Sequence, residues 1–182
     1  MYDELISTLG FALETSRKLT AWLRSLSHDE LQISKEDAEL AIFDKGVTFT
    51  VYSDGENIDR AWPFDIIPRV IPIREWRRIE EGLKQRLQAL NLFIDDLYHE
   101  KKIIRDRIVP KSLIEKSKGF RKECVDITPV HGVWAHICGS DLVRDSDGSV
   151  YVLEDNLRVP SGVSYMIENR EVTKRVLPEM FE

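Results

Sequence analysis

Three oxygen-bearing side chains in the C-terminal third of the chain have the types and spacing of a divalent-metal site. Glu154 and Asn156 are two residues apart in a β-rich run, so they point to one face if the strand reaches Asn156. Asp141 lies in the preceding β-rich run, and the intervening Asp145-Ser146-Asp147-Gly148 predicts a hairpin turn. Carboxylate and amide oxygens are ligands that suit Mg²⁺ or Mn²⁺.

The shared face depends on the register of this hairpin. If the loop has four residues, Asp141 faces Val152 and lies diagonally from Glu154, with about 7–8 Å between the backbones. A loop of three or five residues would move Asp141 to the other face. Acidic residues are also common at strand ends and turns, so the spacing alone leaves a structural role open.

Anion-binding groups follow the last of these residues. Arg158 has a guanidinium group that could neutralise a phosphate. Pro160-Ser161-Gly162 predicts a tight turn whose backbone N–H groups could contact an anion, which makes Ser161 and Gly162 candidate nucleotide-binding residues.

The surrounding pattern predicts an α+β fold, with helices packed on a mixed or antiparallel sheet. Residues 1–45 are expected to be a helical N-terminal segment, and residues 46–182 an α/β region with the metal-binding hairpin at 133–158. The individual expectations are a helix at about 34–43, strands at 47–52 and 59–62, an extended crossing or edge segment at 64–72, a long helix at 74–99, a short helix after Pro110 and a strand at 133–139.

Composition excludes several classes of protein. The 182 residues are 42% hydrophobic and 32% charged with a net charge of −6, which is typical of a globular domain and unlike a nucleic-acid-binding one. No apolar run approaches the roughly 20 residues of a membrane helix. The start of the chain lacks the pattern of a signal peptide. Cys124 and Cys138 are too few for a disulfide framework, which favours free thiols and a cytoplasmic location.

Several long strings together resemble one family. The segments 139–144 and 147–165 are similar to the metal hairpin of ATP-grasp enzymes, and more closely to the circularly permuted ATP-grasp family, which is similar to glutathionylspermidine synthases. The segments 46–52, 64–69 and 90–98 also resemble that family, in the same order. The resemblance covers roughly residues 40–182.

The resemblance implies ATP-dependent ligation of a small-molecule or peptide-like carboxylate to an amine, through an acyl phosphate. It implies that Asp141, Glu154 and Asn156 bind Mg²⁺ (or Mn²⁺), and that Arg158 is a catalytic residue that contacts phosphate. Members usually continue into a nucleotide-clamping part, so we expect this chain to be an incomplete ATP-grasp-like fold, with a partner lobe or a homo-oligomer as its candidate assemblies. The alternative is a non-catalytic module that binds metal or nucleotide, or serves as a scaffold for a separate ATP-binding lobe.

Four further polar residues allow two interpretations each. His99 ends the long helix, where capping competes with a catalytic role, and His136 could point into the site or away from it. Asp65 and Arg69 flank Pro68, and either line a cleft or form a structural ion pair.

Overall fold

The computed structural model describes residues 2–53 and 56–181, and the side chains of residues 2–48 and 62–179. Its elements confirm the α+β class, but the strands form two separate two-stranded sheets, β1–β2 and β3–β4, in place of one larger sheet. The helices and strands are α1 (Arg17–Ser25), α2 (His28–Asp44), β1 (Thr48–Ser53), β2 (Glu56–Ala61), α3 (Ile73–Tyr98), α4 (Lys102–Arg105), α5 (Lys111–Lys116), β3 (Gly139–Arg144), β4 (Val150–Asn156) and α6 (Gly162–Val176), with short 3-10 turns at Glu14–Ser16, Lys122–Cys124, Val130–Gly132 and Pro178–Phe181.

The chain divides into two compact units. Unit 1 comprises residues 1–73, 144–151 and 161–182, and unit 2 comprises residues 74–143 and 152–160. The division predicted at residue 45 separates a helical segment from an α/β region and does not concern compact units, so it stays a prediction. No helix among the described residues is both long and apolar enough to cross a membrane.

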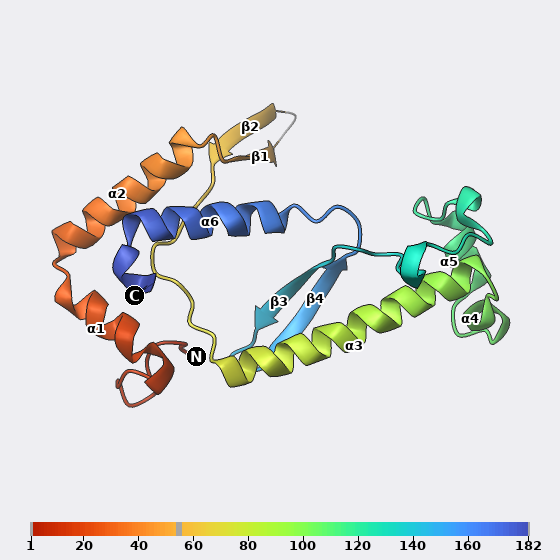
Figure 1. Ribbon diagram of the computed structural model, residues 1–182, viewed down its shortest axis with the longest axis horizontal. Coiled ribbons are helices and arrows are strands. Elements are labelled where there is room, and N and C mark those ends of the chain that lie inside the picture. Colours follow the sequence, from red (N-terminus) through yellow and green to blue (C-terminus); the bar gives the residue numbers. More distant parts are fainter. Residues whose placement is uncertain (1, 54–55, 182) are drawn as a thin grey trace. The chain divides into compact units, whose positions relative to one another are not determined.

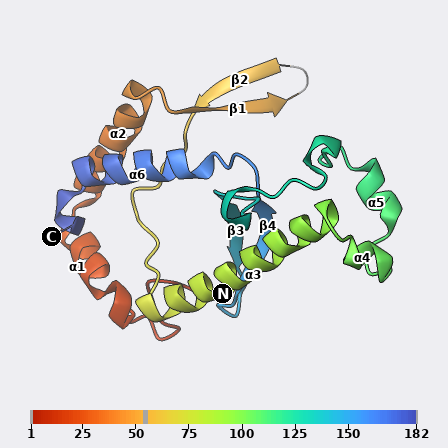
Figure 2. The same ribbon diagram turned by 45° about the vertical axis from the view of Figure 1, so that its right-hand side comes forward.

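Unit 1 has its core between α2 and α6, which lie side by side in both views (Figure 1, Figure 2). Ile42, Val172 and Leu177 are almost completely buried there. Trp62 stacks on Tyr165 at 4.1 Å between ring centroids, and Trp62 also packs against this core. Burial of these aliphatic and aromatic side chains is the main stabilising contribution to this unit.

The start of unit 1 differs from the prediction. Residues 2–13 contain no helix, because the Asp3 carboxylate accepts the N–H groups of Leu5 and Ile6 and holds a local turn. The helix expected at about 34–43 begins at His28, because Ser27 and Glu30 form a capping box. It ends as expected before Gly46, which has a φ of 65°.

The first sheet agrees closely with the prediction. β1 pairs antiparallel with β2, from Thr48 opposite Ala61 to Ser53 opposite Glu56. The second strand begins at Glu56, earlier than the expected 59, and the centre of the predicted turn at 54–55 lies outside the described residues. Residues 64–72 join no sheet, as the prolines at 63, 68 and 72 lead one to expect.

Unit 2 is organised by α3, whose 26 residues match the expected long helix. The strand expected at 133–139 is wrong over residues 133–138, and β3 begins only at Gly139. The reason is that the Asn91 side chain on α3 accepts the backbone N–H groups of Trp134 and Ala135, at 2.8 and 3.0 Å. Those N–H groups therefore have partners without a strand ladder.

Candidate metal and nucleotide site

The β3–β4 hairpin turns over three residues, Ser146 to Gly148, and not over the expected four. The Asp145 N–H donates to the Ser149 carbonyl at 2.8 Å, and the Gly148 N–H donates to the Asp145 carbonyl at 2.9 Å. Gly148 has a φ of 88°, and a Cβ there would lie 2.7 Å from the Tyr2 ring. The turn therefore needs glycine at this position for two separate reasons.

A three-residue loop alone would place Asp141 on the opposite face from Glu154. β3 has six residues, however, and the facing β4 has seven. Toward the open end of the hairpin, Asn156 hydrogen-bonds with both Asp141 and Glu154. One extra residue in β4 between the turn and this end therefore restores the shared face.

The three predicted ligands lie together on an exposed face of the hairpin. The Asn156 Nδ2 amide lies 3.2 Å from Glu154 Oε1 and 3.4 Å from Asp141 Oδ2, which are long hydrogen bonds. Turning the amide would present its oxygen in the same place, because the two ends of an amide differ little in shape. The set of two carboxylates and one amide oxygen then fits Mg²⁺ or Mn²⁺, with water or phosphate oxygens completing the shell.

No group of three His, Cys, Asp or Glu side chains in the described part of the chain is arranged to hold a metal. The hairpin set has only two carboxylates and takes its third oxygen from an amide. As a metal site, this set would therefore be incomplete without oxygens from a phosphate or water.

The opposite face of β4 anchors the hairpin to α3, and the sequence analysis missed this contact. Asp155 lies between Glu154 and Asn156, and its carboxylate accepts from Arg86 Nε at 2.6 Å and from Ser140 Oγ at 2.7 Å. Burial would raise the pKa of Asp155, but these two hydrogen bonds and the Arg86 charge together lower it. Strand alternation indicated that residue 155 faces away from the ligands, but nothing in the sequence pointed to Arg86.

The predicted anion-binding residues follow in a short stretch. Arg158 is exposed, and its guanidinium makes no ion pair with any described residue. Val159 has a φ of 49°, an uncommon conformation for a β-branched residue.

Ser161 and Gly162 start a helix that the sequence analysis did not predict. Gly162 is the first residue of α6, and Ser161 is its N-cap but makes no side-chain cap hydrogen bond. The first backbone N–H groups of a helix lack partners within the helix and favour anions, so these two residues lie where a phosphate could be bound.

The remaining candidates have mainly local roles. His99 Nδ1 lies 2.9 Å from the Asp95 carbonyl at the end of α3, as a capping histidine would. His136 is exposed and lies outside any strand. Asp65 accepts the Ile67 N–H at 2.9 Å, and Arg69 pairs with Glu4, so no ion pair joins Asp65 to Arg69.

The comparisons with known proteins identify the family of this chain. A family model described as circularly permuted ATP-grasp type 2 matches residues 68–182, which include β3, β4 and all the candidate ligands. The chain belongs to the circularly permuted ATP-grasp type 2 family. The resemblance stated from the sequence is thereby confirmed.

Curated relatives of this ATP-grasp chain come from several bacteria. An uncharacterized protein of Synechocystis is 49% identical over 100% of this chain and 38% of its own length. An uncharacterized protein of Mycobacterium leprae is 39% identical over 99% of this chain and 31% of its own length. A putative glutamate–cysteine ligase of Frankia alni is 36% identical over 98% of this chain and 20% of its own length. The chain thus spans less than two-fifths of the length of these relatives.

Proposed function

We propose that this chain supplies the metal-binding part of an ATP- and Mg²⁺-dependent carboxylate–amine ligase. The observation that carries the proposal is the gathering of Asp141, Glu154 and Asn156 on one exposed face of the hairpin, in a chain of the ATP-grasp family. The name of the Frankia alni relative, a putative glutamate–cysteine ligase, supports a ligase that joins a carboxylate to an amine.

In this proposal each residue acts through its charge or its position. Asp141, Glu154 and the amide oxygen of Asn156 hold the metal ion, and Arg158 contacts the phosphate groups of the nucleotide. Ser161 and Gly162 offer backbone N–H groups at the start of α6 to an anion. The metal supplies charge neutralisation and orientation of the phosphates when it is bound.

A further lobe or partner chain supplies the nucleotide clamp, and the substrates are a small-molecule or peptide-like carboxylate and an amine. We also propose a location in the reducing cytoplasm, where thiols such as those of Cys124 and Cys138 stay free.

Calorimetric titration with Mg²⁺ and a non-hydrolysable ATP analogue tests the proposal. We expect the chain alone to bind Mg²⁺, with the phosphates of the analogue strengthening that binding, and a Glu154→Gln variant to bind Mg²⁺ more than about tenfold more weakly. Glu81→Gln, at an exposed glutamate on α3, is the matched control and should bind like the wild type.

The outcomes separate three possibilities. Metal-dependent turnover in the presence of an amine, a carboxylate and the lobe that carries the nucleotide clamp supports the ligase. Binding without turnover favours the non-catalytic module. Equal Mg²⁺ affinity in Glu154→Gln and the wild type would remove Glu154 from the ligand set and overturn the assignment of this face.

A further inference from the structure

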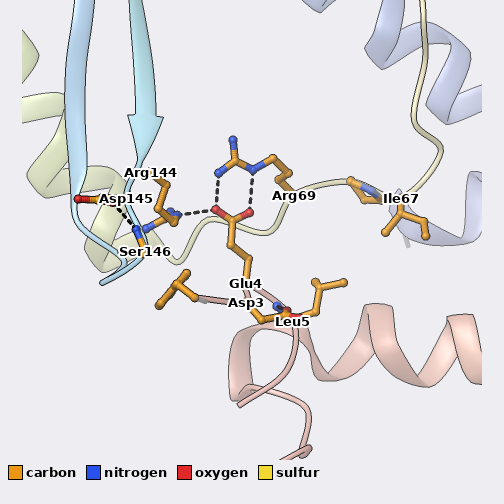
Figure 3. A pocket seen from close by; sticks show the side chains of 10 residues that line it. Asp3, Glu4, Leu5, Ile67, Arg69, Arg144, Asp145 and Ser146 are labelled. Carbon is orange, nitrogen blue, oxygen red and sulfur yellow. Dashed lines mark hydrogen bonds and ion pairs between the residues drawn. The ribbon is translucent and has the colours of Figure 1, made fainter. Parts of the chain in front are cut away.

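Two arginines in unit 1 hold one carboxylate between them (Figure 3). Arg69 Nε donates to Glu4 Oε2 at 2.8 Å, and Arg69 Nη2 donates to Glu4 Oε1, so this pair is bidentate. Arg144 Nε donates to the same Oε1 atom at 2.5 Å. Three charge-assisted hydrogen bonds from two guanidinium groups make a recognition geometry for carboxylates.

Arg144 is held in place by more than this carboxylate. Its side chain is only 9% exposed, and its Nη1 donates to the Gly148 carbonyl at 2.7 Å. The guanidinium also lies 5.1 Å from the centre of the Tyr2 ring. The hairpin turn therefore keeps one half of the carboxylate-binding pair oriented, which lowers the cost of binding a ligand there.

A cavity of about 590 Å³ opens beside the arginine pair. This volume is in the range of small-molecule sites. The cavity has an apolar part formed by Leu5, Ile67 and Pro68. The charged residues that line the rest of the cavity determine which charged groups a ligand can carry.

Two further carboxylates line the same cavity. Asp3 and Asp145 each use Oδ1 to accept a backbone N–H, at 2.7 Å from Leu5 and 2.6 Å from Ser146. Their other oxygens accept no hydrogen bond from the described residues. One cavity thus offers paired cations for a carboxylate and anions for an ammonium group.

We propose that this cavity binds a small zwitterionic, amino-acid-like molecule. Its carboxylate takes the place of the Glu4 side chain against Arg69 and Arg144, and its ammonium group faces Asp3 and Asp145. Glu4 is a built-in competitor on a segment without helix or strand. Arg69 is 65% exposed and can change partners at the surface, while Arg144 stays oriented by the Gly148 carbonyl. This proposal does not rest on the proposed metal site.

The test compares L-norvaline with two probes that each lack one of its charged groups: pentanoate lacks the ammonium group, and butylamine lacks the carboxylate. Calorimetry should show norvaline binding more tightly than either probe that lacks one of its charges. A Glu4→Gln variant should bind norvaline about tenfold more tightly than the wild type, because the competing carboxylate is gone. Adding Arg69→Gln to that variant should weaken binding by about tenfold or more.

Arg17→Gln is the matched control, since Arg17 is an exposed arginine of the same unit that does not line the cavity. Thermal melting shows that each variant is folded. Three results would overturn the proposal: no norvaline binding to folded Glu4→Gln, equal binding after the Arg69 change, or pentanoate binding as tightly as norvaline. The last result would leave a simple anion site without the ammonium contact.

Discussion

Glu154 and Asp155 are adjacent carboxylates on β4 with opposite surroundings. Asp155 has a side chain that is 7% exposed and accepts from a cation and a hydroxyl group. Glu154 is exposed, and its one side-chain hydrogen bond with a described residue is the long one to the Asn156 amide. A carboxylate whose charge is balanced within the chain positions the fold, whereas one that is left unbalanced beside another carboxylate can accept a metal ion.

The largest expected effect comes from removing the balanced carboxylate. Asp155→Ala should lower the free energy of unfolding by about 2 kcal/mol, because charged hydrogen bonds from Arg86 and Ser140 are lost. Glu154→Ala is the matched control and should cost less than about 0.5 kcal/mol, as exposed substitutions usually do. Urea denaturation measures both values. Equal losses would show that Asp155 does not stabilise the fold more than Glu154 does.

Glu4 extends the comparison to unit 1, where it is balanced by two arginines. The hydrogen bonds from Arg69, against the opposing effect of burial and with help from Arg144, lower the pKa of Glu4 from 4.5 to about 2. The unfolded chain therefore binds the proton more readily than the folded one, and the stabilisation is lost as pH falls from about 4.5 to about 2.

We expect the wild type to lose about 1 kcal/mol more of its unfolding free energy than Glu4→Gln over that range, since the exposure of Arg69 limits the effect. Urea denaturation at a series of pH values gives the two curves. Parallel curves would show that the arginines do not hold the Glu4 carboxylate in solution.

The smallest expected effect is a gain in the free energy of unfolding, whereas the effects above are losses. Without metal, Asp141→Asn should raise the free energy of unfolding by a few tenths of a kcal/mol, because like charges facing each other across strands are destabilising. Mg²⁺ should raise the melting temperature of the wild type and not of this variant, since only the wild type retains the ligand set. A variant that is less stable than the wild type without metal would show that Asp141 has a structural role.

The sequence predicted best where one strong pattern acted alone. The apolar residues of α3 repeat at intervals of three and four over many turns, and the helix was found almost to the residue. Residues 133–138 carry an equally β-like pattern, but Asn91 takes up the N–H groups of Trp134 and Ala135. Such a contact joins residues more than forty positions apart, and no local pattern contains it.

The candidate site was predicted in part for the wrong reason. The shared face of Asp141 and Glu154 was derived from a four-residue loop, whereas the hairpin has a three-residue loop and an extra residue in β4. The shorter loop and the extra residue each reverse the face of Asp141 relative to Glu154, so together they leave both residues on the same face. The helix α6 was missed, although Val163, Met166 and Ile167 have helical spacing, because this spacing does not continue to Val172, the residue that the structure buries.

The two contacts of α3 have a consequence for changes in chain length. Arg86 holds β4 at Asp155, and Asn91 holds Trp134 and Ala135, only a few residues before β3 begins. One residue inserted between Arg86 and Asn91 would rotate the Asn91 side chain by about 100° around the helix axis relative to Arg86. It would also shift Asn91 by about 1.5 Å along that axis. The chain could then not keep both the Arg86 contact and the Asn91 contact. The stretch between these two residues should therefore accept many substitutions on its solvent side but no insertion or deletion.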